Sequence, residues 1–316
     1  MKRVLIYLSF VAVFMLLLDI NPALSEEKAV IVVIRSKSIK SYNDALSGFE
    51  AGLNKNGYKI SSSCNLEDNK NKEPQLIDEI KNLKPDLVAT IGTEASLFAK
   101  DNLKGMPIIF FMVINPAETL LTGSLAGSRD NLTGVSLDIL PELQFKKLKE
   151  MLPKLNRVGI IYNAKEKDWI QNIETTAKKL DLLIVAKPIS SAADVPHALD
   201  ELIGSADCLW AQVDPLIYNA QSSQYILLTL LRNKIPFVAF SSQYVKAGAL
   251  LALECDYSDI GRQTAQMAIK VLVNKATASL PVALPERMNL VVNKKIAELI
   301  GIEIPKKLLE EAKEVY

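Results

Sequence analysis

Short apolar runs alternate with amphipathic stretches along most of the chain. Residues 29–34 (AVIVVI) form a continuous apolar, largely β-branched run, which is typical of a strand buried on both faces. The stretch 42–56 follows with apolar residues at helical spacing, and it ends at Gly57, a residue favoured just after a helix. Strands separated by helices favour βαβ units and a parallel sheet. Further strands are predicted at 58–62, 86–91 (DLVATI) and 107–113 (PIIFFMV), with helices at 73–83 and 94–102.

The same pattern then begins again at residue 157. Val30 and Pro107 are 77 positions apart in the first half, and Val158 and Pro236 are 78 positions apart in the second. A repeat of this size predicts two similar Rossmann-like lobes, because solenoid repeats have periods of about 20–50 residues. The second set comprises strands at 157–162 (RVGIIY), 182–186, 207–212 and 236–240, and helices at 168–180, 195–203 and 218–232.

The remaining elements are too few for a third domain. A strand at 131–136 and a helix at 140–152 lead into the second half, and a strand at 249–253, a helix at 260–273 and an extended stretch at 289–292 follow it. We expect them to cross back and complete both lobes. The predicted fold is therefore α/β, with two parallel sheets joined by a multi-stranded hinge. Lobe 1 is expected to comprise 26–138 plus 255–288, and lobe 2 139–254 plus 289–316.

The first 25 residues predict a signal peptide. Lys2 and Arg3 precede an apolar run at 4–18, and the small-x-small tripeptide 23–25 (ALS) ends the segment. The run is short for a membrane span, which needs about 20 apolar residues, although an uncleaved anchor is the alternative. Cleavage is expected after about Ser25, with export of the mature protein.

Composition and charge exclude several classes of function. The 316 residues include 37 Lys and Arg against 36 Asp and Glu, so no net field attracts nucleic acid. The single His excludes an HExxH zinc site, and no metal or cofactor is predicted. The three cysteines Cys64, Cys208 and Cys255 share no metal-ligand spacing and are interpreted as free thiols, although an exported protein could pair two of them.

Enzyme and nucleotide-binding motifs are absent from the sequence. The motifs GxGxxG, GxxxxGK[ST] and GxSxG do not occur. The sequence spacing also places no Ser or Cys nucleophile beside His197. A hydrolase is therefore disfavoured, and a DNA-binding repressor is excluded because the export signal stands where its helix-turn-helix would be. Trp169 and Trp210 are interpreted as packing residues rather than stacking platforms, although a tryptophan near a strand end could do either.

Polar side chains that follow predicted strands are the candidate binding residues, because ligands of open parallel sheets bind beyond the carboxyl ends of the strands. Thr93 opens a helix whose free N–H groups suit a carboxylate, although on its own it also fits a plain helix cap without a ligand. Asp214 can pair with a ligand ammonium or simply close a turn. Tyr162, Asn163 and Ser242 suit a polar small molecule and also suit an ordinary loop.

The chain resembles the tryptophan/tyrosine-type substrate-binding proteins of bacterial ABC transporters, a periplasmic family with the type I binding-protein fold. The resemblance covers essentially the whole chain after the signal segment. Its motifs are 91–93 (IGT), 107–111 (PIIFF), 131–136 (NLTGVS), 152–153 (LP) before 157–163 (RVGIIYN), Asp214, 248–249 (GA), 256–257 (DY) with Gly261, and 293–309 (NKKIAELIGIEIPKKLL).

The resemblance implies a monomeric protein that clamps an amino-acid-like ligand between its lobes and delivers it to an ABC permease of the inner membrane. A sensor that reports the ligand to a membrane receptor is the alternative. Thr93 would hold the ligand carboxylate and Asp214 its ammonium. Many relatives have Asp-Pro where this chain has Asn115-Pro116, which leaves the ligand's identity open. The predicted ligand-binding residues are Ser36, Tyr42, Thr93, Glu94, Asn115, Thr133, Tyr162, Asn163, Asp214, Ser242 and Asp256.

Overall fold

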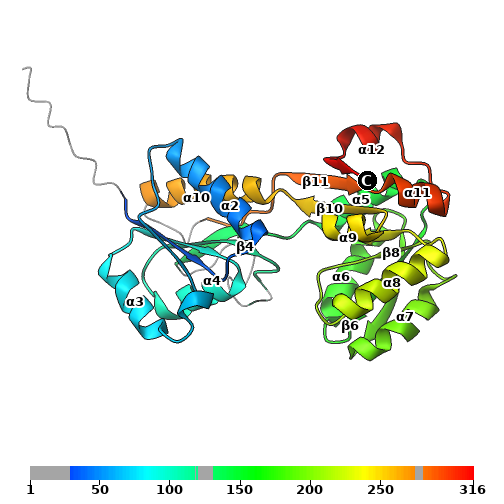
Figure 1. Cartoon of the computed structure of the whole chain (residues 1–316), viewed down its shortest axis with the longest axis horizontal. Helices are drawn as coiled ribbons and strands as arrows, with labels where there is room; N and C mark the ends of the chain where they lie inside the picture. The colour runs from blue at the N-terminus through cyan, green and yellow to red at the C-terminus, as the bar shows by residue number, and fades with distance from the viewer. Residues whose placement is uncertain (1–28, 118, 120–130, 275–279) are drawn as a thin grey trace, which may run out of the picture.

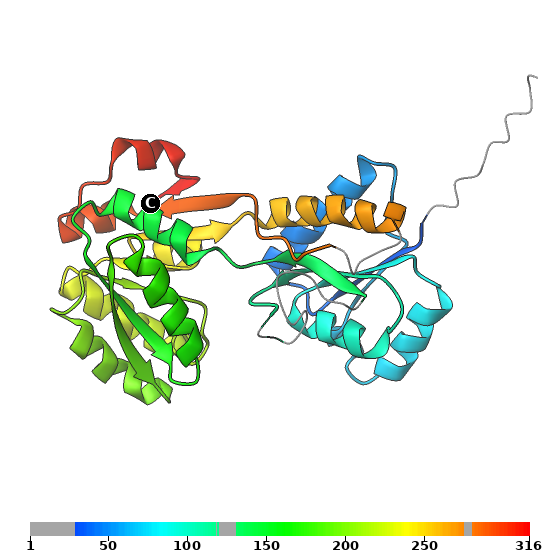
Figure 2. The same ribbon diagram turned by 180° about the vertical axis from the view of Figure 1, so that it is seen from behind.

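The computed structural model describes residues 29–117, 119, 131–274 and 280–316. The predicted signal peptide lies outside these residues. The described chain forms two lobes, which lie side by side and are joined by extended segments (Figures 1 and 2). None of the described helices combines the length and the hydropathy that a membrane span requires.

Lobe 1 is built on a parallel five-stranded sheet with helices on both faces. Its strand order is β2-β1-β3-β4-β5. Helices α2 (Lys40–Asn54) and α10 (Tyr257–Asn274) cover one face, and α3 (Glu73–Asn82) and α4 (Thr93–Asn102) cover the other. The strands are buried between these layers, as continuous apolar runs predict. The strands are β1 (Ile31–Arg35), β2 (Ser62–Asn65), β3 (Leu87–Ile91), β4 (Ile108–Val113) and β5 (Leu132–Ser136), with a 3₁₀ turn at Glu67–Asn69.

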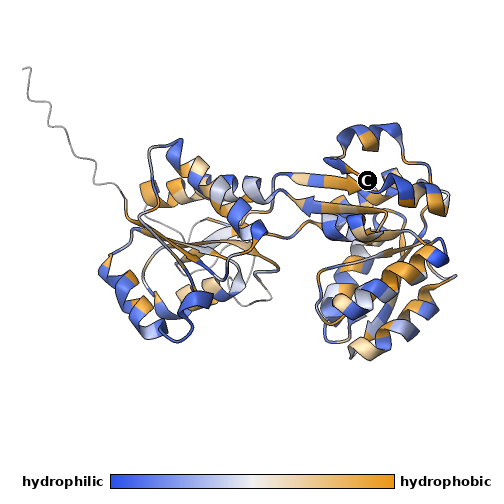
Figure 3. Ribbon diagram, viewed as in Figure 1, coloured by the Kyte–Doolittle hydropathy of each residue, from blue (hydrophilic) through white to orange (hydrophobic). Residues whose placement is uncertain are grey.

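Lobe 2 is built on a seven-stranded sheet of order β12-β11-β10-β9-β8-β6-β7. Strands β10 and β11 pair antiparallel, and the other pairs are parallel. Apolar residues concentrate in the strands and on the inner sides of the helices (Figure 3). The strands are β6 (Arg157–Asn163), β7 (Leu183–Ile189), β8 (Cys208–Trp210), β9 (Phe237–Ala239), β10 (Leu251–Cys255), β11 (Met288–Val292) and β12 (Glu314–Val315).

Helices also cover both faces of this second sheet. One core cluster lies under α5, α6, α11 and α12, and a second lies under α7, α8 and α9. The helices are α5 (Pro141–Met151), α6 (Lys167–Lys178), α7 (Val195–Leu202), α8 (Ala220–Arg232), α9 (Ser242–Ala247), α11 (Lys294–Ile300) and α12 (Lys306–Glu311), with a 3₁₀ turn at Ala192–Asp194.

The internal repeat is present in three dimensions. The order β7-β6-β8-β9 in lobe 2 repeats β2-β1-β3-β4 in lobe 1. Asp86, before β3, accepts a hydrogen bond from the Val30 N–H at 2.8 Å, and Asp207, before β8, accepts one from the Arg157 N–H at 2.7 Å. Each aspartate thus holds the start of the neighbouring strand. The predicted fold class of two Rossmann-like lobes is confirmed.

Two predicted strands lie at shifted positions. The strand predicted at 58–62 occurs at Ser62–Asn65, because Tyr58 and Ile60 instead pack on the lobe 1 core after helix α2 ends. The strand predicted at 249–253 occurs at Leu251–Cys255, following Gly248, which has a positive φ of 131°. In both cases apolar residues stand before the residues that pair in the sheet.

The lobes are joined where the chain leaves β5, where it leaves β10 and where it enters β11 (Figure 1). These segments are tied to one another: the Asp256 N–H donates to the Arg287 carbonyl at 3.3 Å, and the Cys255 thiol donates to the Leu137 carbonyl at 3.3 Å. The residue boundaries predicted for the two lobes stay a prediction.

Candidate functional site

Two adjoining cavities lie between the lobes and form one cleft. The smaller has a volume of about 400 Å³ and the larger, next to the joining strands, about 820 Å³; we call them the inner cavity and the hinge cavity. They share Ile114 and Asp138 from lobe 1 and Gln212 and Val213 from lobe 2. Volumes of this size suit a small molecule.

The lobe 1 side of the inner cavity contains the start of helix α4. Thr93 is its first residue and lines the cavity. The first N–H groups of a helix have no partner within it and carry partial positive charge, so this end can receive a carboxylate.

Gly92 holds this helix end in place. Its φ is +91°, and a Cβ added there would lie 2.5 Å from the Tyr42 hydroxyl oxygen and 2.7 Å from the Ser36 hydroxyl oxygen. Only glycine accepts both the conformation and the contact. The Ser36 hydroxyl also donates to the Ile91 carbonyl at 3.1 Å and accepts from the Ala95 N–H at 3.0 Å. Ser36 and Tyr42 therefore fix the loop that presents Thr93.

The lobe 2 side of the inner cavity contains Asp214. Its Oδ1 accepts a hydrogen bond from the Leu216 N–H at 2.8 Å, which fixes the turn. Its Oδ2 is buried and has no hydrogen-bond partner among the residues that the structure describes. Burial raises the pKa of the Tyr218 hydroxyl, with smaller contributions from Tyr244 and then from Asp214. A buried carboxylate oxygen without a partner is costly, so it favours a ligand that donates to it.

A second carboxylate, Asp138, lies where the two cavities meet. Both of its oxygens accept from the Asn115 N–H at 2.9 Å, and Oδ2 accepts from the Ser136 hydroxyl at 2.5 Å. Burial raises the pKa of Asp138, and the Ser136 and Asn115 hydrogen bonds oppose that shift. Asp138 therefore supplies a carboxylate next to the loop that follows β4. The residue of that loop itself, Asn115, has a neutral side chain.

An aromatic pair borders the inner cavity on lobe 2. Trp169, in the first turn of α6, lines the cavity and stacks on Trp210 with ring centroids 6.2 Å apart and planes within 5° of parallel. The Trp210 indole N–H donates to Gln144 Oε1 at 3.0 Å. Trp210 is a buried packing residue, as interpreted from the sequence, but Trp169 is also a cavity residue.

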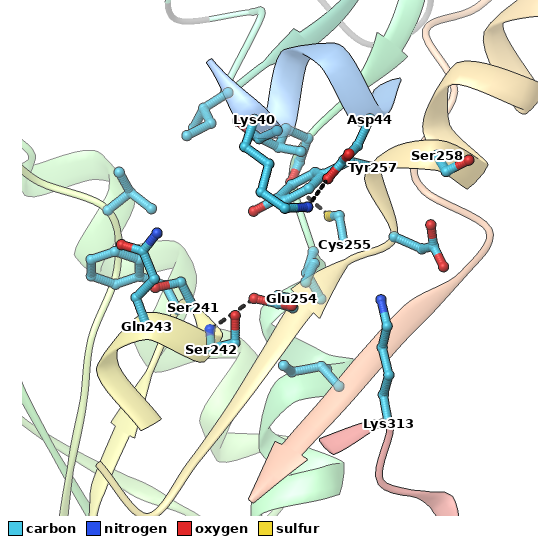
Figure 4. A pocket seen from close by; sticks show the side chains of 18 of the residues that line it. Lys40, Asp44, Ser241, Ser242, Gln243, Glu254, Cys255, Tyr257, Ser258 and Lys313 are labelled. Atoms are coloured by element: carbon cyan, nitrogen blue, oxygen red, sulfur yellow. Dashed lines mark hydrogen bonds and ion pairs between the residues drawn. The ribbon is translucent and has the colours of Figure 1, made fainter. Parts of the chain in front are cut away.

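The hinge cavity is lined by polar and charged side chains from both lobes (Figure 4). From α2, Lys40 pairs with Asp44 at 2.6 Å. From lobe 2, Glu254 accepts from the Ser242 N–H at 2.8 Å, so the start of helix α9 is already occupied by a carboxylate of the chain. Asp256 also lines this cavity, and its Oδ1 accepts from the Asp259 N–H at 3.1 Å.

The structure brings together about half of the predicted binding residues. Those lining the inner cavity are Thr93, Asn115, Tyr162 and Asp214, and those lining the hinge cavity are Ser242 and Asp256.

The other predicted residues do not line either cavity. Ser36 and Tyr42 support the Gly92 loop, and Glu94 points to solvent from the first turn of α4. The Thr133 hydroxyl is fully buried and donates to the Leu280 carbonyl at 2.9 Å, so it has no free group for a ligand. The Asn163 side chain accepts from the Lys165 N–H at 3.1 Å and shapes its own loop.

The sequence reasoning missed Asp138, Trp169 and Gln212. Asp138 and Gln212 stand just past β5 and β8, so inspection of every strand end would have found them. Trp169 carried no such signal, because its position in the cavity depends on how α6 packs against β8. No group of acidic, His or Cys side chains in the described chain could hold a metal ion.

The three cysteines are free thiols, as interpreted from the sequence. Burial raises the pKa of Cys64 to about 11 and that of Cys255 to about 12, and it also raises the pKa of Cys208. We expect the folded protein at pH 8 to react with a disulfide reagent roughly two orders of magnitude more slowly than an unstructured thiol, because the thiolate is the nucleophile. All three thiols should react at once in denaturant. A thiol that reacts rapidly in the folded protein would contradict this assignment.

Two lobes around a common cleft define a binding protein of the type I periplasmic class. The chain belongs to the family of ABC transporter substrate binding proteins, whose model matches residues 28–316. It is therefore a non-enzymatic solute-binding protein of an ABC transporter system, a family that works outside the cytoplasm.

Relatives agree with this assignment. The tyrosine-binding protein of Clostridioides difficile (strain R20291) is 28% identical over 271 residues, which are 83% of this chain and 78% of the relative. A ligand-free, open substrate-binding protein with adhesive properties from Clostridium difficile is 25% identical, with a TM-score of 0.79 over 91% of this chain and 99% of that one. An ABC domain in complex with L-Trp from Streptococcus pneumonia is also 25% identical, with a TM-score of 0.68 over 92% of this chain and 100% of that one.

Proposed function

We propose that this protein binds an aromatic amino acid in the inner cavity and delivers it to an ABC permease of the inner membrane. The observation that carries the proposal is the buried Oδ2 of Asp214, which has no hydrogen-bond partner in the described part of the chain and lies in a cavity whose opposite lobe presents the start of helix α4. The export signal predicted at 1–25, with cleavage expected after about Ser25, supports a periplasmic location.

The two halves of the cavity match the two ends of an amino acid. Asp214 from lobe 2 would accept hydrogen bonds from the ammonium group, and the N–H groups at Thr93 from lobe 1 would receive the carboxylate. A ligand held at both ends touches both lobes only when they approach. Closure would therefore be driven by the ligand's higher affinity for the closed state.

Two relatives support an aromatic amino acid as the ligand. One is named as a tyrosine-binding protein, and the structure of the other was solved in complex with L-Trp. Because the family is shared, a similar ligand is the first to test. Asn115 and the charged loop after Asn163 allow the ligand to have a different side chain.

A thermal shift panel of the 20 amino acids tests the proposal. A ligand present at 100 times its Kd should stabilise the protein by about 2.7 kcal/mol, and isothermal titration would then give the affinity. We expect tyrosine, tryptophan or phenylalanine to produce the largest shift. If none of the 20 amino acids shifts the transition, the proposal is wrong.

Acidic amino acids should be rejected by the same cavity. Asp138 and Asp214 both line it, and none of its described lining residues is Lys or Arg. A ligand side-chain carboxylate would meet like charge without a compensating cation, which we expect to weaken binding at least about tenfold. Titration of glutamate beside glutamine, its neutral isostere, measures this. Equal affinity for the two would contradict the assignment of the inner cavity as the binding site.

A further inference from the structure

The tryptophan pair stands at the cleft edge of the lobe 2 sheet. Strands β6 and β8 are neighbours, and Trp210 is the last residue of β8. Helix α6 follows β6, and Trp169 is in its first turn. Both rings are therefore brought to the carboxyl edge of the sheet, where ligands of this fold class bind.

The Trp169 ring is held in place by rings and hydrogen bonds behind it. It stacks on Trp210, which in turn packs against Phe145 with centroids 4.9 Å apart and donates to Gln144 at 3.0 Å. The Gln144 amide donates to the Ile139 carbonyl at 3.0 Å. A side chain supported in this way loses little additional conformational freedom when a ligand packs on it.

Trp169 is only half-buried, although Trp210 behind it is 1% exposed. The accessible part of its indole borders the inner cavity together with Ile161, Tyr162 and Ile217. These residues form an apolar and aromatic wall in a cavity whose other lining groups include the carboxylates Asp138 and Asp214. The wall lies on the same lobe as Asp214, the group proposed to hold the ammonium.

We infer that Trp169 is a specificity-determining residue that selects a planar aromatic side chain by stacking, with Trp210 as its support. This inference rests on the proposed function, because it assigns the side-chain end of the same ligand. Aromatic pairs in offset-stacked or edge-to-face arrangements are favoured beyond the area that they bury, whereas a saturated ring of similar size gains only from burial.

The test compares phenylalanine with cyclohexylalanine, which has a saturated ring on the same amino-acid backbone. Isothermal titration is carried out with the wild-type protein and with Trp169→Leu and Trp169→Phe. We expect the wild type to prefer phenylalanine, and Trp169→Leu to lower that preference roughly three- to tenfold. Trp169→Phe keeps a ring and should retain most of the preference. The ratio between the two ligands is used because a general loss of packing would weaken both equally.

Tyr225→Leu is the matched control. Tyr225 is 40% exposed on α8 and lines neither cavity of the cleft, so the same ring-to-leucine change should leave the ratio unaltered. An unchanged ratio in Trp169→Leu, or a wild type without preference for the planar ring, overturns the inference while amino-acid binding stands. A wild type that binds no amino acid at all overturns the proposed function instead.

Discussion

Replacing Asp214 with asparagine is expected to weaken amino-acid binding by about 30-fold or more. Removing one partner of a buried charge-assisted pair typically costs about 2–5 kcal/mol, and each 1.4 kcal/mol is a tenfold change in Kd. Asparagine keeps a side-chain oxygen that can still accept from the Leu216 N–H, so the turn should survive. The loss would therefore report the missing charge opposite the ligand ammonium.

Isothermal titration with the best amino acid of the thermal shift panel measures this effect. Asp200→Asn is the matched control, because Asp200 is exposed on α7 and the substitution removes the same charge from the chain without touching the cleft. The melting temperature of ligand-free Asp214→Asn should stay close to that of the wild type. Unchanged affinity in a folded Asp214→Asn protein would show that the ammonium is held elsewhere.

Replacing Gly261 with alanine is expected to destabilise the protein by about 1–3 kcal/mol, the usual cost of overpacking a core. A Cβ at Gly261 would lie 1.9 Å from the Ala45 carbonyl oxygen and 2.7 Å from the Phe49 nitrogen, both backbone atoms of α2. Gly48 makes the reciprocal approach, since a Cβ there would lie 1.9 Å from the Ser258 carbonyl oxygen. The contact attaches α10, which follows the lobe 2 strand β10, to lobe 1. Helices α2 and α10 would have to separate to admit the methyl group.

The sign of the change in the free energy of unfolding decides this prediction. In an exposed helix interior, glycine to alanine stabilises by about 1 kcal/mol through helix propensity alone. Denaturant unfolding of Gly261→Ala should show a lower midpoint than the wild type. Gln266→Ala, an exposed position of the same helix, should stay within about 0.5 kcal/mol. A stabilised Gly261→Ala protein would contradict the close packing of α2 on α10.

Much of the fold was predictable because its signals are local. The run at residues 29–34 is apolar at every position, and β1 is indeed buried between two helical layers. Asp86 and Asp207 stand at equivalent places in the two halves, and each holds the start of the neighbouring strand. The ends of β2 and β10 were misplaced because hydrophobicity reports burial, whereas a strand is defined by its pairing partner.

The site was only partly predictable. Thr93 and Asp214 were found because each lies a few residues after a strand that ends at the cleft. Thr133 was proposed from a motif, but its hydroxyl points to the Leu280 carbonyl, a contact across 147 positions that no local pattern encodes. Trp169 was interpreted as a packing residue with a stacking platform as the alternative, since a tryptophan in an amphipathic helix has the same sequence signature whether or not a cavity lies beside it.

The sequence by itself determined the two Rossmann-like lobes, their repeated order and the polar residues at their strand ends, because hydrophobic periodicity and turn chemistry act between near neighbours. The tertiary structure alone decided which of those residues share a cleft. It joined Asp138 to Asn115 across 23 positions, set Trp169 on Trp210, and placed Asp214 across from helix α4. These contacts depend on the order of the strands within each sheet and on the orientation that the hinge gives to the two lobes. Both are properties of the whole chain.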